Sequence, residues 1–331
     1  MESAEVAETT TVRAPRNRTL TLNRQEEKLY SKQLVRLSGP TAVDAVTDKL
    51  INQDVFKILN FLPAGFVDLL ILDPPYNLNK TFKSAAFKKT GINKYAEWFE
   101  SLLVALLPLL KDNASVYVCS EWYSSTAIHL VLDKHLKVRS RITWEREKGR
   151  GAKRNWKNAS EDIWFATVSD DYVFNVDDVK LKRRVIAPYT DDKGRPKDWN
   201  DCDDGQFRLT HPSNLWNDIT VPFWSMPENT DHPTQKPEKL MAKLILASTN
   251  ENDFVLDPFA GVGSSLVAAR KLNRRFLGIE TEKEYCLLAA RRLDLAKLDS
   301  AIQGYHEGVF WERNTLSLQR RIKELGDRGG R

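Results

Sequence analysis

An apolar run that ends in two prolines is the feature that most constrains this chain. Residues 67–72, Val-Asp-Leu-Leu-Ile-Leu, are typical of a buried strand, and Asp73, Pro74, Pro75 and Tyr76 follow directly. Proline cannot extend a central strand, so the strand must end in a stiff turn. Open α/β sheets bind ligands at the carboxyl ends of their strands. A carboxylate beside an aromatic ring in such a turn suits a flat ring that carries an exocyclic amine.

Strand-like and helix-like segments alternate over most of the chain. We expect strands at 115–119, 138–144, 161–167, 254–257 and 276–280, and helices at 94–111, 124–135, 237–249, 264–272 and 283–298. This alternation predicts an α/β fold with a mostly parallel sheet that helices cover on both faces. Residues 77–93 are rich in lysine, lack periodicity and are expected to form a flexible loop.

Changes in composition along the chain suggest its organisation. Residues 1–25 are polar, which predicts a mobile N-terminal arm. Residues 170–228 are rich in Pro, Asp, Asn, Trp and Lys and have little periodicity, which indicates an inserted segment. The stretches 26–169 and 229–300 would then be two parts of one domain, and 301–331 a helical C-terminal tail.

Charge and cysteine usage exclude several classes of protein. The net charge of +5 over 331 residues only weakly favours an anionic partner. Cys119, Cys202 and Cys286 lie far apart in no metal-ligand spacing, which predicts no bound metal and a reducing compartment without disulfides. No secretory signal or membrane-length apolar run is visible, so we expect no membrane partner.

A second strand and turn carries two glycines. Residues 254–265 read Phe-Val-Leu-Asp-Pro-Phe-Ala-Gly-Val-Gly-Ser-Ser. Gly261 permits a positive φ in the turn, and Gly263 would let a ligand approach the backbone. By itself, such a turn is as often a plain connection between strand and helix as a binding site. Asp257 is either a cap at the strand end or a cofactor ligand.

The residues after the glycine turn narrow the choice of ligand. Glu280 comes seventeen residues after Gly263, at the end of the next expected strand, where an acid can bind both hydroxyls of a ribose. Leu266 occupies the position of the third glycine of a dinucleotide fingerprint, and no P-loop lysine follows. A nucleoside cofactor without a pyrophosphate is therefore favoured, and S-adenosylmethionine is the commonest one.

Taken with these turns, the segment His232-Pro233-Thr234-Gln235-Lys236-Pro237 makes the chain resemble the beta class of DNA amino-methyltransferases. That class contains adenine-N6 and cytosine-N4 enzymes and is circularly permuted, with the Asp-Pro-Pro-Tyr motif ahead of the glycine motif. Here Asp73 precedes Gly261 by 188 residues. The resemblance covers about residues 45–298. It implies a Rossmann-like, S-adenosylmethionine-dependent methyltransferase fold in which 170–228 is the target-recognition segment.

The resemblance also implies roles for individual residues. The catalytic residues would be Asp73, Pro74, Pro75 and Tyr76. The cofactor-binding residues would be Asp54, Asp73, His232, Thr234, Lys236, Asp257, Phe259, Gly261, Gly263 and Glu280. Asp73 and the Pro74 carbonyl would accept the two amine hydrogens of the target base. Tyr76 would stack on that base after it is flipped out of double-stranded DNA.

The implied function is a site-specific DNA adenine-N6 methyltransferase of a bacterial restriction–modification system, located in the prokaryotic cytoplasm. Aspartate rather than serine at position 73 favours adenine, while cytosine N4 remains an alternative. A DNA-binding regulator that has the fold without the catalysis is an alternative of another class. A homodimer and a cognate restriction endonuclease that acts on the same site are the expected protein partners.

Two basic stretches are candidates for DNA contact. Residues 146–157 hold six basic side chains and one acid, which suits phosphate contact, although a solvated loop without a special role is the alternative. The inserted segment is expected to read bases in the major groove. The expected DNA-binding residues are Arg150, Lys153, Arg154, Trp156, Lys182, Arg183, Arg184 and Arg195. Trp216 is expected to be a core residue.

Overall fold

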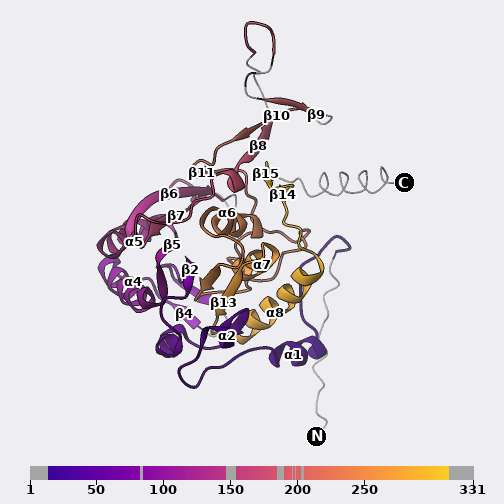
Figure 1. The fold of residues 1–331 in the computed structure, drawn as a ribbon. Helices are drawn as coiled ribbons and strands as arrows, with labels where there is room; N and C mark the ends of the chain where they lie inside the picture. Colours follow the sequence, from indigo (N-terminus) through magenta and orange to yellow (C-terminus); the bar gives the residue numbers. More distant parts are fainter. Residues whose placement is uncertain are drawn as a thin grey trace.

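Eight strands form the central sheet of the computed structural model (Figure 1). The structure describes residues 14–82, 85–146, 154–184, 190–195, 197, 199–202 and 205–312. The strands are β1 Lys49–Ile51, β2 Val67–Leu72, β5 Leu110–Ser120, β6 Lys137–Glu145, β7 Ser160–Thr167, β11 Leu215–Trp216, β12 Phe254–Asp257 and β13 Arg275–Ile279. Their order across the sheet is β1-β13-β12-β2-β5-β7-β6-β11.

The sheet is mostly parallel, as predicted. Strand β2 pairs in parallel with β12 on one side and with β5 on the other. Strand β7 is the exception, because it runs antiparallel to both β5 and β6. The two predicted strands that precede the key turns, β2 and β12, are therefore direct neighbours although they are far apart in the sequence.

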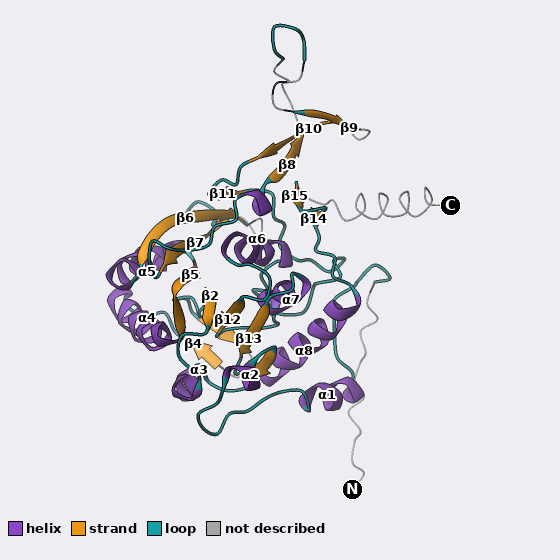
Figure 2. Ribbon diagram, in the orientation of Figure 1, coloured by secondary structure: helices purple, strands orange, loops and turns teal. Residues whose placement is uncertain are grey.

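Helices cover both faces of this sheet (Figure 2). They are α1 Arg24–Ser31, α2 Val43–Val46, α3 Val55–Ile58, α4 Ile92–Leu106, α5 Trp122–His135, α6 Glu238–Ser248, α7 Ser264–Lys271 and α8 Lys283–Leu298. Short 3-10 turns lie at Leu59–Phe61, Leu107–Leu109 and Asp177–Val179. The helix predicted at 94–111 ends at Leu106, since Pro108 cannot donate a helical hydrogen bond.

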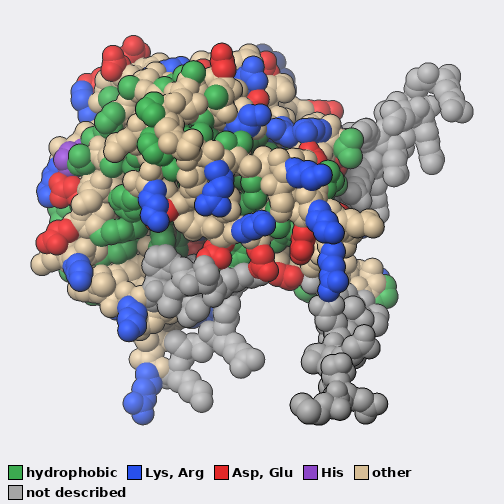
Figure 3. Space-filling view, turned by 90° about the horizontal axis from the view of Figure 1, so that it is seen from below, with side chains coloured by type: hydrophobic (Ala, Val, Ile, Leu, Met, Phe, Trp, Pro, Cys, Tyr) green, Lys and Arg blue, Asp and Glu red, His purple; other side chains and the backbone are tan. Residues whose placement is uncertain are grey.

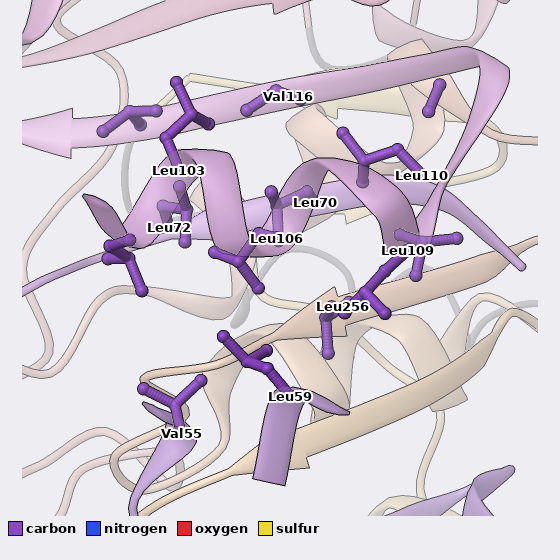
Figure 4. Packing of buried hydrophobic residues seen from close by; sticks show 14 of the residues in the cluster. Val55, Leu59, Leu70, Leu72, Leu103, Leu106, Leu109, Leu110, Val116 and Leu256 are labelled. Carbon is purple, nitrogen blue, oxygen red and sulfur yellow. The ribbon is translucent and has the colours of Figure 1, made fainter. Parts of the chain in front are cut away.

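The alternation of side chains along β2 explains the two layers of the core. Leu70 and Leu72 belong to the apolar cluster that contains residues of α4 and α5, as Figure 4 shows for the α4 side. Leu69 and Ile71 point the other way and belong to the cluster that contains residues of α6, α7 and α8. Because both faces of β2 are buried, its end is firmly placed.

A second sheet of five strands contains part of the inserted segment. Its strands are β8 Leu181–Arg184, β9 Asn200–Cys202, β10 Gly205–Thr210, β14 Tyr305–His306 and β15 Val309–Trp311, in the order β14-β15-β8-β10-β9. In Figure 1, β9 and β10 lie at the top, far from α1. The expected helical tail is wrong for 301–312, where β14 and β15 form a hairpin. Residues 313–331 lie outside the described part. Trp216 is buried in the main core, as expected.

Two further expectations need correction. The expected loop at 77–93 contains a short hairpin of β3 Lys80–Phe82 and β4 Ala85–Phe87. The expected N-terminal arm cannot extend to residue 25, because the Arg18 and Leu20 amides donate hydrogen bonds to the segment at 224–229. Residues 1–13 lie outside the described part.

Two other kinds of feature are absent from the described residues. No helix there is both long and apolar enough to cross a membrane. No group of three or more His, Cys, Asp and Glu side chains in the same ranges could hold a metal ion.

Candidate active site

The order of the strands creates a crevice at one edge of the sheet. From the adjacent strands β2 and β12, the chain leads to β5 on one side and to β13 on the other. Ligands bind at such switch points, outside the carboxyl ends of the strands. Asp73 directly follows β2, Asp257 ends β12, and Glu280 directly follows β13. All three therefore lie at the same edge.

A cavity of about 460 Å³ opens at this edge, and both predicted turns line it. Ligand sites in proteins commonly have volumes of this size. The predicted site residues that line it are Asp54, Asp73, Pro74, Pro75, Tyr76, His232, Thr234, Lys236, Asp257, Phe259, Gly261 and Glu280. Apolar side chains such as Trp98, Met241 and Leu78 line other parts of its wall. The two turns thus share one enclosure.

The catalytic turn is held by a lysine from the third motif. Lys236 Nζ lies 2.9 Å from Asp73 Oδ1 and 2.7 Å from Asp73 Oδ2, and it donates to the Tyr76 hydroxyl at 3.1 Å. The Tyr76 hydroxyl lies 3.0 Å from Asp73 Oδ1. The Lys236 side chain is only 4% exposed. Lys236 therefore contacts the catalytic turn directly, whereas the family resemblance implied a role in cofactor binding.

A second carboxylate completes this cluster. Glu161 Oε2 lies 3.2 Å from the Tyr76 hydroxyl and 3.3 Å from Lys236 Nζ. Its other oxygen accepts from Arg146 Nη1. Two carboxylates and the Lys236 ammonium thus surround the Tyr76 hydroxyl, and Arg146 pairs with the second carboxylate.

Burial and charge fix the protonation of two members of the cluster. Burial and the nearby Asp73 and Glu161 carboxylates raise the pKa of Tyr76 well above its usual value, so its hydroxyl keeps its hydrogen. Burial alone would lower the pKa of Lys236. Asp73 and Glu161 outweigh that effect and raise the pKa, so Lys236 stays an ammonium ion.

Backbone contacts brace the rest of the turn. The Tyr95 hydroxyl from α4 donates to the Pro75 carbonyl at 3.2 Å. The Asn77 side chain exchanges hydrogen bonds with the backbone of Thr90, at 3.0 and 2.7 Å. These contacts fix the path of the chain on both sides of Tyr76.

On the cofactor side of the cavity, backbone amides hold the acids. Glu280 accepts from the Gly261 amide at 2.9 Å and from the Glu282 amide at 2.7 Å, and its burial raises its pKa. Asp257 accepts from the Phe259 amide at 3.0 Å and from the Ser265 hydroxyl. Burial raises the pKa of Asp257 to about 7. Asp257 is thus a cap at the strand end, one of its two predicted roles, and it also lines the cavity.

Positive φ angles explain both glycines of the turn, and close packing adds a second reason at Gly263. Gly261 has φ 51°, and a Cβ at that position would lie 3.4 Å from His232 Nε2. Gly263 has φ 74°, but it does not line the cavity. A Cβ on Gly263 would lie 2.9 Å from the Ala289 Cβ of α8. The expected reason for Gly263, close approach of a ligand, is therefore replaced by close packing between helices.

The remaining cofactor-side predictions also have local structural contacts. The His232 ring packs edge-on against Tyr285, with centroids 4.4 Å apart, and its Nδ1 accepts from the Thr234 amide at 3.3 Å. Asp54 caps helix α3 by accepting from the Phe56 amide at 2.9 Å. Both side chains nevertheless line the cavity.

The predicted DNA-contact loop is only partly described. Arg150 and Lys153 lie outside the described residues. Arg154 is exposed, and Trp156 is 93% exposed, so a flat aromatic face is presented to solvent. Figure 3 shows one face of the molecule, on which Lys and Arg side chains are scattered among hydrophobic and other side chains.

The predicted DNA-contact residues of the inserted segment already have intramolecular contacts. Lys182 Nζ lies 4.1 Å from the centre of the Trp311 ring. Arg183 Nε lies 3.8 Å from Glu312 Oε1. Arg195 pairs with Asp191 at 2.9 Å. The side chain of Arg184 lies outside the described part.

The sequence prediction missed Glu161 and Arg146 as members of the site. Strand β7 is antiparallel, so its beginning lies at the edge where the parallel strands end. Strand β6 ends at that same edge, directly before Arg146. The signal available in the sequence was a carboxylate at the very start of an apolar strand. Its meaning depends on the strand direction, which the sequence pattern does not reveal.

Comparison with known proteins agrees with this geometry. The DNA adenine methyltransferase YhdJ of Escherichia coli (strain K12) is 33% identical over 272 residues, which cover 79% of this chain and 88% of that protein. The type II methyltransferase M.HpaI of Haemophilus parainfluenzae is 32% identical over 249 residues, or 74% of each chain.

The solved PvuII DNA methyltransferase (cytosine-N4-specific) is 17% identical and shares the fold with a TM-score of 0.55, over 74% of this chain and 85% of that one. A family model for N6 and N4 enzymes, described as DNA methylase, matches residues 67–291, which include both turns of the cavity. This match confirms the resemblance seen in the sequence, and the chain belongs to the DNA methylase family.

Proposed function

We propose that this DNA methylase transfers the methyl group of S-adenosylmethionine to the exocyclic N6 of an adenine flipped out of double-stranded DNA. The observation that carries the proposal is the shared cavity, in which Asp73 and Tyr76 face the same space as Gly261 and Glu280. A methyl donor and its acceptor must meet within a few ångströms. Two turns on adjacent parallel strands supply that proximity.

The residues of the cavity fit the donor. Its volume of about 460 Å³ is in the range for a nucleoside-sized ligand. Glu280 is suited to bind ribose hydroxyls, and the acids on this side of the cavity, Glu280 and Asp257, suit a cationic ligand better than a phosphate. When bound, S-adenosylmethionine supplies a methyl group made electrophilic by its sulfonium.

Asp73 and the Pro74 carbonyl then position the acceptor nitrogen. The lone pair of an aromatic amine is delocalised into its ring, and hydrogen bonds from both amine hydrogens favour a pyramidal nitrogen. With the donor bound, the nitrogen lone pair would take the methyl group and the electrons of the broken C–S bond would stay on sulfur. The surplus proton of the amine would pass to Asp73, the acceptor of its hydrogen bond. The chain needs no nucleophile of its own, and burial keeps the thiol of Cys119 protonated by raising its pKa.

Tyr76 supports the flipped base. Unstacking a base costs a few kcal/mol. Stacking on an aromatic ring returns about 1–3 kcal/mol per base, which offsets much of that cost. Contacts to Lys236 and Glu161 hold the Tyr76 hydroxyl, so the orientation of the ring is set before the base arrives.

Adenine is favoured over cytosine by two observations. Aspartate stands at the first position of the Asp-Pro-Pro-Tyr turn. The relative that is 33% identical is named a DNA adenine methyltransferase. The cytosine-specific PvuII enzyme is only 17% identical, and its likeness concerns the fold alone.

Mass spectrometry of nucleosides tests this proposal. Unmethylated genomic DNA is incubated with the protein and S-adenosylmethionine, digested and analysed. We expect N6-methyladenine, and far less of it in the same reaction time with the Asp73→Asn variant. N4-methylcytosine in its place would overturn the choice of base. The absence of both would favour the regulator that has the fold without the catalysis.

The proposal extends to how DNA is bound. Residues 170–228 would be the target-recognition segment and 146–157 a phosphate-contacting loop; the solvent exposure of Arg154 and Trp156 supports the second part. Reversing the charges of Arg150, Lys153 and Arg154 should reduce the salt dependence of DNA binding. An unchanged salt slope would remove this loop from the proposal.

The expected cellular setting is also part of the proposal. We place the enzyme in a prokaryotic cytoplasm, as a homodimer beside a restriction endonuclease that cuts the same site. The support is that M.HpaI, which is 32% identical, is a type II methyltransferase of a bacterium. Sedimentation of the purified protein tests the dimer. Protection of methylated DNA from a candidate endonuclease tests the pairing.

A further inference from the structure

Glu161 is a buried carboxylate that none of the three sequence motifs contains. It is 2% exposed and stands one residue after the start of β7. Its polar contacts are Tyr76, Lys236 and Arg146. Removing a carboxylate from water carries a large desolvation penalty, which only close polar partners offset. Its placement beside the catalytic turn therefore needs an explanation.

Two carboxylates in this cluster share one set of donors. The Tyr76 hydroxyl has a single hydrogen, yet Asp73 Oδ1 lies 3.0 Å away and Glu161 Oε2 lies 3.2 Å away. Only one of these oxygens can receive the hydrogen at a time. The Lys236 ammonium likewise lies 2.7 Å from Asp73 Oδ2 and 3.3 Å from Glu161 Oε2. A small shift would move either donor from one acid to the other.

In the structure described, both oxygens of Asp73 are engaged by Lys236. Each oxygen has two lone pairs, so an amine hydrogen of a target base competes with Lys236 and Tyr76 for them. Moving Lys236 away from Asp73 without another acid nearby would leave its buried charge poorly paired, which is costly. Glu161 removes this difficulty, because it can accept the hydrogen bond of Lys236 that Asp73 gives up. The charges of Asp73, Glu161, Lys236 and Arg146 stay balanced before and after this exchange.

We propose that Glu161 is a positioning residue that takes over the Tyr76 hydroxyl and part of the Lys236 ammonium when the target base binds, and so frees an oxygen of Asp73 for the base. The inference rests on the proposed function, in which Asp73 binds the amine. Arg146, at the end of β6, holds the other oxygen of Glu161 and keeps that carboxylate facing the cluster.

The Glu161→Gln variant tests this role, because it keeps the size of the side chain and removes the charge. We expect kcat to fall about 10–100-fold, the usual scale for losing a hydrogen bond to a charged group. The Kd for S-adenosylmethionine should stay within about twofold, since Glu161 acts on the acceptor side. Equal kcat values for the wild type and a folded Glu161→Gln variant would overturn the proposal.

Asp162→Asn is the matched control. Asp162 is the next residue of the same strand, so its side chain lies on the opposite face, where it accepts from Ser125 at 2.7 Å. This variant should keep its kcat. If Asp162→Asn and Glu161→Gln lost activity equally, the effect would belong to the strand as a whole, and the proposal would be wrong.

The coupling between Glu161 and Tyr76 in their effects on kcat distinguishes a positioning role of Glu161 from general support of the fold. Tyr76→Phe keeps the ring and removes the hydroxyl that Glu161 holds. In this background, Glu161→Gln should have a smaller effect on kcat than in the wild type, because residues of one hydrogen-bond network are non-additive. Fully additive losses would contradict an action through Tyr76.

Glu161→Asp keeps the test sharp if the glutamine variant fails to fold. It retains the charge but withdraws it by one methylene from Tyr76 and Lys236. A folded Glu161→Asp protein with reduced kcat supports the proposal, and one with wild-type kcat overturns it. Wild-type protein that methylates no DNA would instead overturn the proposed function, so the two failures are distinguishable.

Discussion

The two sides of the cavity hold their carboxylates by different means. On the cofactor side, Glu280 accepts from two backbone amides, and Asp257 accepts from one amide and the Ser265 hydroxyl. On the catalytic side, the contacts of Asp73 come from the side chains of Lys236 and Tyr76. Asp73 and Asp257 stand at the ends of the neighbouring parallel strands β2 and β12. Their surroundings, not their place in the sheet, therefore distinguish them.

This difference separates a fixed surface from an adjustable one. Backbone donors of a packed turn move little, so the cofactor side is suited to bind one ligand in one pose. Side-chain donors can exchange partners, so the catalytic side can release an oxygen to an incoming base. We therefore expect substitutions on the two sides to affect different measured quantities.

The largest effect should come from Asp73→Asn. The amide nitrogen cannot accept a hydrogen bond from the amine, and kcat should fall by about 10²–10³-fold, the scale for loss of one preorganised polar contact in a transition state. Affinity for S-adenosylmethionine, measured by calorimetry, should remain close to that of the wild type. A variant with near wild-type kcat would contradict the role of Asp73 in holding the amine of the target base.

Glu280→Gln should have the opposite signature. Loss of a charged acceptor for the ribose hydroxyls should weaken binding of S-adenosylmethionine by about 10–100-fold, while kcat at saturating donor changes little. Glu251→Gln, in the exposed turn before β12, is the matched control and should bind normally. A fall in kcat with unchanged affinity would show that the two sides are not functionally separate.

Gly261 and Gly263 test the packing of the cofactor-side turn through the unfolding free energies of their alanine variants. Alanine at either position meets a positive φ, which costs about 1–2 kcal/mol. At Gly263 the new methyl would also collide with the Ala289 Cβ, so Gly263→Ala should lower the unfolding free energy by about 1–2 kcal/mol more than Gly261→Ala. Denaturant unfolding of both variants measures the difference. Equal losses would show that α8 adjusts to the added methyl.

The smallest effect concerns pH. Burial raises the pKa of Asp257 to about 7, above the usual value of an unfolded chain. The folded protein then binds this proton more tightly between about pH 4 and pH 7, so the contribution of Asp257 to the unfolding free energy falls as pH rises through that interval. The decline ends above about pH 7.

Asp257→Asn isolates this contribution. Burial also raises the pKa of Glu228 to about 7, so the wild-type profile contains both groups. The difference between the wild-type and Asp257→Asn profiles should change by about 1 kcal/mol between pH 6 and pH 7. Parallel profiles would mean that Asp257 is ionised throughout, as a more solvated acid would be.

Local signals in the sequence predicted the two turns well. They could not predict which strands, far apart in the sequence, pair with one another. Asp73 and Gly261 could be placed because an apolar strand and its breaking residues are adjacent in the sequence. Glu161 could not, because its position depends on the antiparallel direction of β7. The hairpin at 301–312 was missed for a related reason, since β15 joins a sheet through its pairing with β8 from the distant inserted segment.

A crystal structure of the protein with bound S-adenosylmethionine tests the central claim most directly. We predict that the ribose hydroxyls meet Glu280 and that the sulfonium methyl points across the cavity toward Asp73 and Tyr76. A donor bound elsewhere, or one whose methyl group is separated from Asp73 by protein, would contradict the shared cavity on which the methyl transfer depends.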